Sequence, residues 1–526
     1  MEIFHKGDII GRSSLSSDTL QSKDFESGNH FKEHKSPIHG GALREGGAPN
    51  LLSKDCLGLL VQYAAVGLVY GVLPATTYPF LQNYLNASGA QVTTANTLLF
   101  LPWSFKCFYG ILSDCVPLWG YRRRPWMVIG WIICLSMLII MACMPAGDPY
   151  YTVSADRDIK PADYTPEIKA RINSTAASQA AKYVMLMCFA GAGYVLADVC
   201  ADSIVVEFAQ REPLESRGKT QSAIYAVRTV FVITGQLLTG FCFNGEEYGG
   251  DFGFSLTFSQ LMIILAVLLV PVIPMTWFFI KEEKKPHVNF MLYIRELWEL
   301  IQKRVVYQVI LFTFFHSMLS QITYTASSPV QSYLVGFTPL NASINNILGT
   351  ILIVAGIMVP SKLGPAMGLA LDGRLHCFRT EIALSVSSFV VVELSGTGNE
   401  GVVYGLITMV SNLAQPFATA MTLLIDQPFN LTTERIQTDD ESIRMDITYV
   451  VIIMYAMTVF SWIFLIFLPR QKEETQALLR TGGSSKMMGA ITVAYLTFAF
   501  VWSVMTNIMA IFHSTSCLII AGGSGC

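Results

Sequence analysis

The sequence predicts an all-α, polytopic membrane helical bundle, and three observations support this fold class. Apolar residues make up 52% of the 526 residues and charged residues only 14%, whereas a soluble chain usually carries about 25% charged residues. The mean hydropathy is +0.46. Apolar runs recur along the chain at lengths close to the roughly 20 residues that a helix needs to cross about 30 Å of hydrocarbon. Because lipid offers no hydrogen-bond partners, each run is expected to be helical.

The apolar runs fall into two sets on either side of a polar segment. The first set comprises residues 57–80, 93–112, 126–144, 182–208, 220–243 and 258–280. The second set comprises residues 305–328, 345–371, 401–425, 448–468 and 488–512. A further run, 382–394, is short for a spanning helix. We therefore expect about 11–13 transmembrane helices.

This pattern predicts five parts of the chain. Residues 1–52 are poor in apolar residues and rich in Ser, Gly, Lys and His, so they cannot bury a core and are expected to be a disordered cytoplasmic tail. The other expected parts are a six-helix N-terminal half (53–280), a cytoplasmic linker (281–304), a C-terminal half shortened near 363–400 (305–470), and an extra helix with a tail (471–526).

Basic residues and glycosylation sequons predict the orientation. Loops 113–125, 209–219 and 281–304 hold clusters of Lys and Arg, which favour the cytoplasmic side, and the N-terminus is expected on the same side. The alternate loops carry N-x-S/T sequons, which are glycosylated only on the outer or lumenal side. These candidates are Asn86, Asn173 and Asn341. They indicate the plasma membrane or another membrane of the secretory route.

The side of the C-terminus stays open at this stage. Loops 372–380 and 469–486 carry basic residues, whereas loop 426–446 carries a further sequon. All three fit only if an odd number of helices crosses between residues 381 and 425. Either 382–394 does not span, or a helix is absent relative to a complete bundle.

Several function classes lack support in the sequence. A net charge of −3 gives no basis for a nucleic-acid partner. We find no phosphate-binding Gly-rich loop and no metalloprotease or hydrolase motif, so we expect neither an enzyme nor a cofactor. The eleven Cys show no metal-ligand spacing and are expected to be buried small residues, except that Cys517 and Cys526 can form a disulfide.

The most distinctive stretch is 102–126, PWSFKCFYGILSDCVPLWGYRRRPW. Gly110 allows a neighbouring helix to approach closely, and Asp114 lies at a helix end where it can pair with an Arg across the loop. The three candidate partners are Arg122, Arg123 and Arg124. We interpret these five residues as a conformational latch. The alternative is a simple basic loop that only sets topology.

The longer pattern in this stretch, W-x-x-K-x-x-x-G-x-x-S-D-x-x-P-x-x-G-Y-R-R-R-P from Trp103 to Pro125, resembles the folate–biopterin transporter family of the major facilitator superfamily. The stretches 197–222 and 398–417 are similar to that family as well, and the resemblance fades at 363–390. It implies a two-half, major-facilitator-like bundle. It also implies a secondary transporter that moves folate or biopterin-like pterins by alternating access.

Four charges within the apolar runs are candidates for a solute or proton pathway, because ionisable groups in hydrocarbon are costly unless paired or wet. Asp198 and Asp202 lie on one helical face. At 1.5 Å per residue, they lie about 15 and 9 Å from the cytoplasmic end of their helix. Arg228 and Lys106 lie about 12 and 9 Å inside theirs. We expect the four to form one cluster, either facing a central cavity or serving only as a packing salt bridge.

This cluster suits the solute that the resemblance implies. A pterin ring presents adjacent N–H donors to a carboxylate, and Arg228 or Lys106 can bind the carboxylates of a folate. A buried Asp can also exchange a proton, which allows symport. Trp103 and Tyr225, with Tyr70 and Tyr78, can stack on the ring, although such aromatics are more often core or lipid-facing. The alternatives are another organic solute or sugar, or a non-transporting membrane protein that kept the fold.

Overall fold

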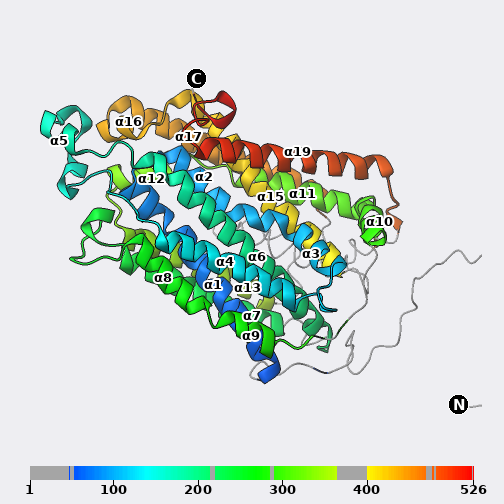
Figure 1. Cartoon of the computed structure of the whole chain (residues 1–526). Coiled ribbons are helices and arrows are strands. Elements are labelled where there is room, and N and C mark those ends of the chain that lie inside the picture. Colours follow the sequence, from blue (N-terminus) through cyan, green and yellow to red (C-terminus); the bar gives the residue numbers. More distant parts are fainter. Residues whose placement is uncertain are drawn as a thin grey trace, which may run out of the picture.

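The computed structural model describes residues 53–213, 219–282, 290–363, 400–468 and 481–523, together with residues 47, 284, 477, 478 and 525. The predictions for the tail 1–52, the short run 382–394, most of the region 363–400 and Cys526 lie outside the described residues. Within the described part of the chain, the protein is a bundle of long helices (Figure 1). Seven helical segments there are long and apolar enough to cross a membrane. The predicted all-α, multi-pass membrane fold is confirmed.

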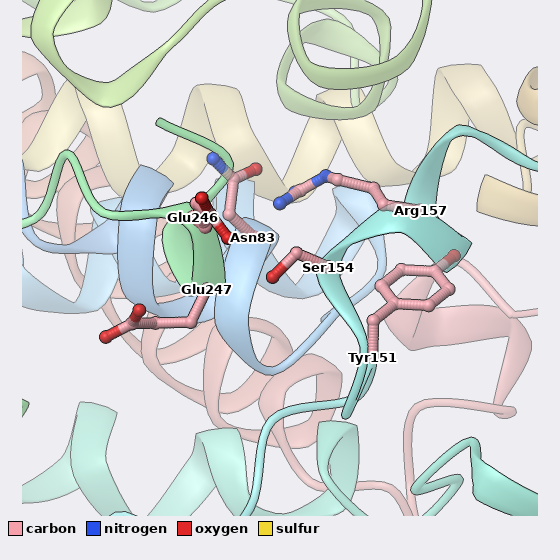
Figure 2. A pocket seen from close by; sticks show the side chains of 6 residues that line it. All are labelled: Asn83, Tyr151, Ser154, Arg157, Glu246 and Glu247. Atoms are coloured by element: carbon pink, nitrogen blue, oxygen red, sulfur yellow. The ribbon is translucent and has the colours of Figure 1, made fainter. Parts of the chain in front are cut away.

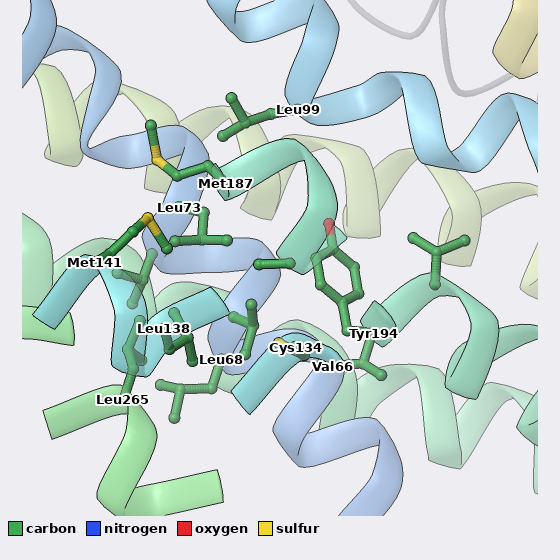
Figure 3. Packing of buried hydrophobic residues seen from close by; sticks show 14 of the residues in the cluster. Val66, Leu68, Leu73, Leu99, Cys134, Leu138, Met141, Met187, Tyr194 and Leu265 are labelled. Carbon is green, nitrogen blue, oxygen red and sulfur yellow. The ribbon is translucent and has the colours of Figure 1, made fainter. Parts of the chain in front are cut away.

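The N-terminal half contains the helices that carry most of the predicted site. They are α1 (Lys54–Ala75), α2 (Gly89–Phe100), α3 (Lys106–Cys115), α4 (Arg124–Cys143), α6 (Ala180–Gln210), α7 (Lys219–Cys242), α8 (Phe258–Leu269) and α9 (Val272–Phe279). Helix α4 packs against α6, and α1 packs against α7. Their buried apolar side chains, together with those of α2 and α8, form one continuous core (Figure 3).

Glycines allow α1 and α7 to approach very closely. A Cβ atom added to Gly67 would lie 2.3 Å from the backbone oxygen of Arg228, and one added to Gly71 would lie 2.3 Å from that of Val232. Both distances are far below van der Waals contact, so only glycine fits at these two positions. This G-x-x-x-G face is a common device for tight packing of membrane helices, and it fixes the position of Arg228 against α1.

Prolines interrupt three of these membrane segments. Helix α1 ends just after Pro74 and continues as a π-helical turn, Thr77–Tyr84. The second predicted run is not one continuous helix, because a 3₁₀ turn at Leu101–Phe105, with Pro102 in its first turn, separates α2 from α3. Pro271 separates α8 from α9. Proline removes a backbone donor and clashes with the preceding turn of helix, which accounts for each break.

The C-terminal half has its own core. Its described helices are α10 (Phe290–Ile301), α11 (Arg304–Ser320), α12 (Ser327–Pro329), α13 (Pro339–Leu363), α15 (Glu400–Asp426), α16 (Thr433–Thr438), α17 (Glu441–Phe460) and α19 (Lys486–Ile511). Helix α11 packs against α15, and α15 packs against α19. The two halves meet where α7 contacts α13 and where α15 contacts α2 and α3.

Loops from both halves meet at the end of the bundle that carries the three sequons, which we call the outer end. There the loop 144–179, which includes the short helix α5 (Pro166–Arg171), reaches α16. Lys160 Nζ donates to the Thr438 carbonyl oxygen at 3.2 Å, and Gln437 Nε2 donates to the Tyr151 hydroxyl at 2.9 Å. The opposite end, the inner end, carries the loop between α3 and α4 and the start of α11.

Candidate functional site

The break at Pro102 positions Lys106 and Trp103. The 3₁₀ turn Leu101–Phe105 ends where α3 begins, so Lys106 is the first residue of α3 and Trp103 precedes it by one turn. Asp198 and Asp202 lie one helical turn apart on α6, and Arg228 lies on α7. Three membrane segments therefore contribute the four charges that the sequence singled out.

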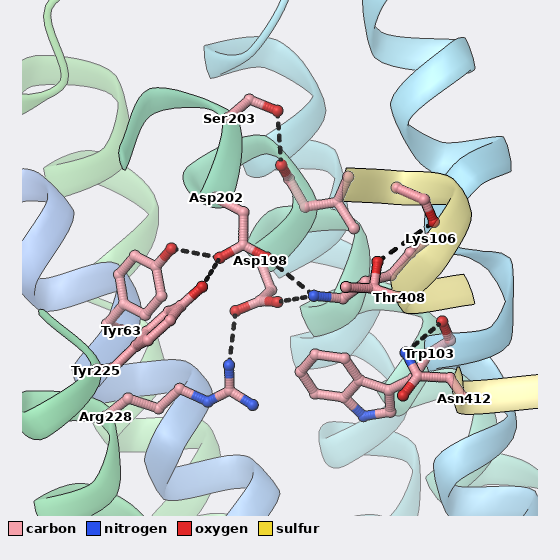
Figure 4. A network of polar contacts seen from close by, with 12 residues as sticks. Tyr63, Trp103, Lys106, Asp198, Asp202, Ser203, Tyr225, Arg228, Thr408 and Asn412 are labelled. Carbon is pink, nitrogen blue, oxygen red and sulfur yellow. Dashed lines mark hydrogen bonds and ion pairs between the residues drawn. The ribbon is translucent and has the colours of Figure 1, made fainter. Parts of the chain in front are cut away.

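The structure brings these four charges together (Figure 4). Lys106 Nζ lies 3.1 Å from Asp198 Oδ2 and 2.9 Å from Asp202 Oδ2. Arg228 Nη1 lies 3.7 Å from Asp198 Oδ1. The side chains of Lys106, Asp198 and Asp202 are 8%, 0% and 8% exposed. We call these four residues the charge cluster, and its two cations and two anions sum to zero formal charge.

One carboxylate oxygen of Asp198 accepts no hydrogen bond from the described residues. Its Oδ1 atom is buried and makes no hydrogen bond with the described part of the chain, and the Arg228 guanidinium at 3.7 Å is beyond ordinary hydrogen-bonding distance. A buried oxygen of this kind normally has a donor. The position between Asp198 and Arg228 can therefore accept a donor group from a solute.

Aromatic rings surround the two cations. Lys106 Nζ lies 4.6 Å from the centroid of the Trp103 ring, and the Arg228 guanidinium lies 4.9 Å from the same ring and 5.6 Å from Tyr70. Tyr70 and Trp103 pack edge to face, with centroids 5.5 Å apart. Cation–π contacts of this kind partly replace the hydration that the cations lose on burial. Trp103 and Tyr70 thus lie beside the charge cluster.

Two tyrosines fix the second aspartate. The Tyr63 hydroxyl donates to Asp202 Oδ1 at 2.6 Å, and the predicted Tyr225 hydroxyl approaches the same oxygen at 3.5 Å. Tyr63 is fully buried, and the sequence reasoning did not single it out. One signal was available, because Tyr63 and Tyr70 are seven residues apart and therefore lie on the same face of α1.

Helix α15 of the C-terminal half lies against this site. Asn412 Nδ2 donates to the Trp103 carbonyl oxygen at 3.2 Å, and the Gly405 position lies within 4 Å of the backbone of Cys107. The charge cluster is built in the N-terminal half, but α15 contacts the 3₁₀ turn that carries Trp103. The two halves therefore contact each other at this turn.

Tyr78, which was considered for ring stacking, lies elsewhere. Its hydroxyl donates to the Phe337 carbonyl oxygen at 2.7 Å, at the outer end. A small pocket at the same end is lined by Asn83, Tyr151, Ser154, Arg157, Glu246 and Glu247 (Figure 2). It is separate from the charge cluster. Among the described residues, no group of three or more His, Cys, Asp or Glu side chains is arranged to hold a metal ion.

The loop between α3 and α4 contains the predicted latch residues. Asp114 Oδ1 pairs with Arg123 Nη2 at 2.6 Å, and Arg123 Nη1 also donates to Ser113 Oγ at 2.6 Å. Arg123 is thus a partner of Asp114. The Arg124 guanidinium instead donates to the Trp277 carbonyl oxygen. Among the described residues, no neighbour lies within 4 Å of a Cβ atom added to Gly110, so no described helix makes the close approach expected there.

Glu282, which sequence reasoning missed, holds this loop to the end of the first half. Its carboxylate accepts the backbone N–H groups of Arg122, Arg123 and Arg124 at 2.8, 2.9 and 2.9 Å. These amides lie at the start of α4, where backbone donors have no partner within the helix and an anion is favourable. The loop between α3 and α4 therefore binds Glu282 through its backbone and Asp114 through the Arg123 side chain.

The three sequons all lie at the outer end. Asn341 is exposed, whereas Asn86 and Asn173 are half-buried. Asn86 has a left-handed backbone conformation, with φ of 53°, and its side-chain oxygen accepts the Tyr333 hydroxyl at 2.7 Å. Cys517, near the same end, is disulfide-bonded, and its predicted partner Cys526 lies outside the described residues.

Comparison with known proteins agrees with the motif. Residues 66–155 match the model of the BT1 family. The chain is 24% identical over 182 residues to the probable folate-biopterin transporter 4 of Arabidopsis thaliana, covering 35% of this chain and 31% of that protein. It is 26% identical over 267 residues to the folate-biopterin transporter of Synechocystis sp., covering 51% and 46%. The chain is thus similar to proteins named folate-biopterin transporters. These matches span about a third to a half of the relatives' length.

Solved structures with similar helix arrangements were also found. One, described as showing substrate recognition in proton-dependent oligopeptide transporters, is 11% identical, with a TM-score of 0.47, and the match covers 81% of this chain and 99% of that one. Another, the inward-open xylose transporter XylE from E. coli, is 12% identical, with a TM-score of 0.44, and the match covers 80% and 98%.

Proposed function

We propose that this chain is a secondary transporter that moves a small organic solute across a membrane by alternating access. The observation that carries the proposal is the charge cluster, which places two cations and two anions from three membrane segments in one buried contact. Charges at such depth are costly and usually mark a solute or ion pathway. The relatives named folate-biopterin transporters favour folate or a biopterin-like pterin as the solute.

The parts of the cluster suit such a solute in different ways. The Asp198 oxygen that makes no hydrogen bond within the described residues can accept the adjacent N–H donors of a pterin ring. Arg228 and Lys106 can bind carboxylates, and Trp103 and Tyr70 offer aromatic faces. A buried aspartate of the cluster can carry a proton. Proton coupling is therefore part of the proposal.

The Asp114–Arg123 pair is proposed to act as a latch at the inner end. It joins the end of α3 to the start of α4, and the same loop is tied to the end of α9 through Glu282. These ties hold α3, which carries Lys106, in a fixed position relative to the rest of the first half. Breaking Asp114–Arg123 would shift the balance between the two open states, which binding of a solute can also shift. We propose that the inner end faces the cytoplasm and that the outer end faces the lumen or exterior.

Uptake into vesicles that contain the full chain tests the proposal. Labelled folate, biopterin and a panel of common metabolites would be offered across a pH gradient to the wild-type chain and to Asp202→Asn. A matched control, Asp163→Asn, changes an exposed aspartate of the outer loop. We expect uptake of a folate or pterin by the wild type and the control, with loss in Asp202→Asn while the protein level is unchanged.

Each other result has a definite meaning. Uptake that Asp202→Asn leaves unchanged removes the charge cluster from the mechanism. Uptake of another organic solute or a sugar in place of folate and pterin corrects the substrate. If no solute in the panel enters, the chain is a non-transporting membrane protein that kept the fold.

A further inference from the structure

The two halves contain equivalent turns at the outer end. The sequence Q-N-Y-L at 82–85 is repeated as Q-S-Y-L at 331–334. The first covers the end of the π-helical turn Thr77–Tyr84 and its C-cap Leu85, and the second lies within the π-helical turn Val330–Leu334. A proline precedes each repeat, Pro79 or Pro329. Single π-helical turns are rare in proteins and are frequent at functional sites.

The same relation continues into the next helices. Ser88 Oγ accepts the backbone N–H of Gln91 at the start of α2, at 3.3 Å. Thr338 Oγ1 accepts the backbone N–H of Asn341 at the start of α13, also at 3.3 Å. Each turn is thus followed by a hydroxyl cap and a membrane helix. The order of helix, π-helical turn, cap and helix indicates that the two segments are internal repeats, a common construction in transporters.

The two turns contact each other through equivalent residues. Ser332 Oγ donates to Asn83 Oδ1 at 3.0 Å, and these two residues occupy the same position in Q-S-Y-L and Q-N-Y-L. Elements related by an approximate two-fold axis touch through equivalent residues only where they lie on that axis. Tyr333 adds a hydrogen bond to Asn86, just beyond the first turn, at 2.7 Å.

Arg157, from the loop between α4 and α6, contacts the second of these turns. Its Nη2 atom donates to Ser332 Oγ at 3.1 Å, and its guanidinium lies 5.7 Å from the centroid of the Tyr333 ring. The guanidinium also packs on Gly249, where an added Cβ atom would lie 2.5 Å from Nη1. Gly249 has a φ of +72°, so both backbone conformation and space require glycine beside Arg157.

We propose that the two π-helical turns are the facing sides of an outer gate and that Arg157 holds this gate closed. The inference rests on the alternating access proposed above, because such a cycle needs an outer end that separates. Ser332–Asn83 and Tyr333–Asn86 are single polar contacts, and a hydrogen bond is typically worth about 0.5–1.5 kcal/mol net. Lys160–Thr438, Gln437–Tyr151 and Tyr78–Phe337 also join the two halves at this end, where Gly89 packs closely on the Thr325 carbonyl oxygen. Opening the gate breaks these contacts as well, whereas the glycine-packed contact of α1 with α7 lies within one half.

A cysteine pair tests the gate directly. In the full chain in vesicles, Asn83→Cys/Ser332→Cys would be cross-linked with an oxidant or a short bifunctional thiol reagent. We expect a cross-link that reduces uptake to the level of empty vesicles, with recovery on reduction for the disulfide. The control pair, Glu247→Cys/Ser255→Cys, joins neighbours within one half and should leave uptake intact. Failure to cross-link, or normal uptake by the cross-linked chain, overturns the proposal.

A second measurement does not depend on knowing the solute. The labelling rate of Ser332→Cys by a membrane-impermeant thiol reagent reports how often the gate opens, with the native cysteines as background. Adding Arg157→Gln should increase this rate severalfold, whereas Lys169→Gln, an exposed change in the same loop, should not. An unchanged rate with Arg157→Gln refutes the role of Arg157. If the wild type transports nothing, the proposed function fails, and the labelling rate still decides whether the outer gate exists.

Discussion

Replacing Lys106 by methionine should destabilise the protein strongly. Methionine fills the space of the lysine stem but leaves Asp198 and Asp202 on one face of α6, with Arg228 at 3.7 Å from Asp198 as the remaining cation of the cluster. The side chains of Lys106 and Asp202 are only 8% exposed, and that of Asp198 is fully buried. Removing one partner of a buried ion pair typically costs about 3–5 kcal/mol, and we expect a loss of that size.

A second substitution should restore part of this loss. Lys106→Met/Asp202→Asn removes one cation and one anion, so the cluster is again neutral, and the introduced amide oxygen can still accept the Tyr63 hydroxyl. Residues in direct contact are coupled, so their effects are not additive, with interaction energies of roughly 0.5–3 kcal/mol. The double variant should therefore be more stable than Lys106→Met alone, yet should not transport, because the pathway groups are missing.

Thermal unfolding in detergent, followed by size-exclusion chromatography, measures the stability, and vesicle uptake measures the transport. Lys169→Met is the matched control, because Lys169 is an exposed lysine of α5 and should change neither property. If the double variant loses as much stability as the two single variants combined, the charges act independently. The structural basis of the charge cluster would then be wrong, whatever the uptake.

Three further predictions concern single groups. Glu282→Gln should destabilise the start of α4 by about 1–2 kcal/mol, because a charge beside three backbone donors becomes a neutral amide; thermal unfolding against the exposed control Glu246→Gln checks this, and equal stabilities would contradict it. Tyr63→Phe should cost about 1–3 kcal/mol, because a buried carboxylate loses its 2.6 Å donor, and unchanged unfolding would contradict it. The backbone N–H of Ile443 lowers the pKa of Asp440, the cap of α17. The ionised carboxylate therefore stabilises this cap at pH values above the usual Asp pKa of about 3.9. This stabilisation is lost as the pH falls through the lower pKa that Asp440 has in the folded protein. Hydrogen exchange of the Ile443 amide, corrected for its intrinsic rate, should accelerate in that window, and an unchanged corrected rate would contradict the cap.

Depth along a helix could be predicted from the sequence, and rotation about the helix could not. The rise of 1.5 Å per residue placed Lys106, Asp198, Asp202 and Arg228 in one layer, and the structure brings them into contact. The same rise places Tyr78 about 12 Å from Tyr70 along the chain direction of α1, so depth separates these two tyrosines. Tyr78 lies at the outer end rather than beside the charge cluster, in line with its depth. Rotation is harder to predict, because both faces of a membrane helix are apolar and hydropathy does not show which face packs against another helix.

The sequence by itself determined the membrane class, the approximate spans and the family resemblance, because lipid sets the length and polarity of each helix. It also identified Asp114 and the three arginines as one unit. Only the tertiary structure decided that Arg123 is a partner of Asp114, that Glu282 holds the start of α4, and that the turns at Asn83 and Ser332 meet. Glu282 lies more than 150 residues from this loop in the sequence, and the two turns lie 249 residues apart. Such contacts depend on how whole helices pack, which no local pattern of residues records.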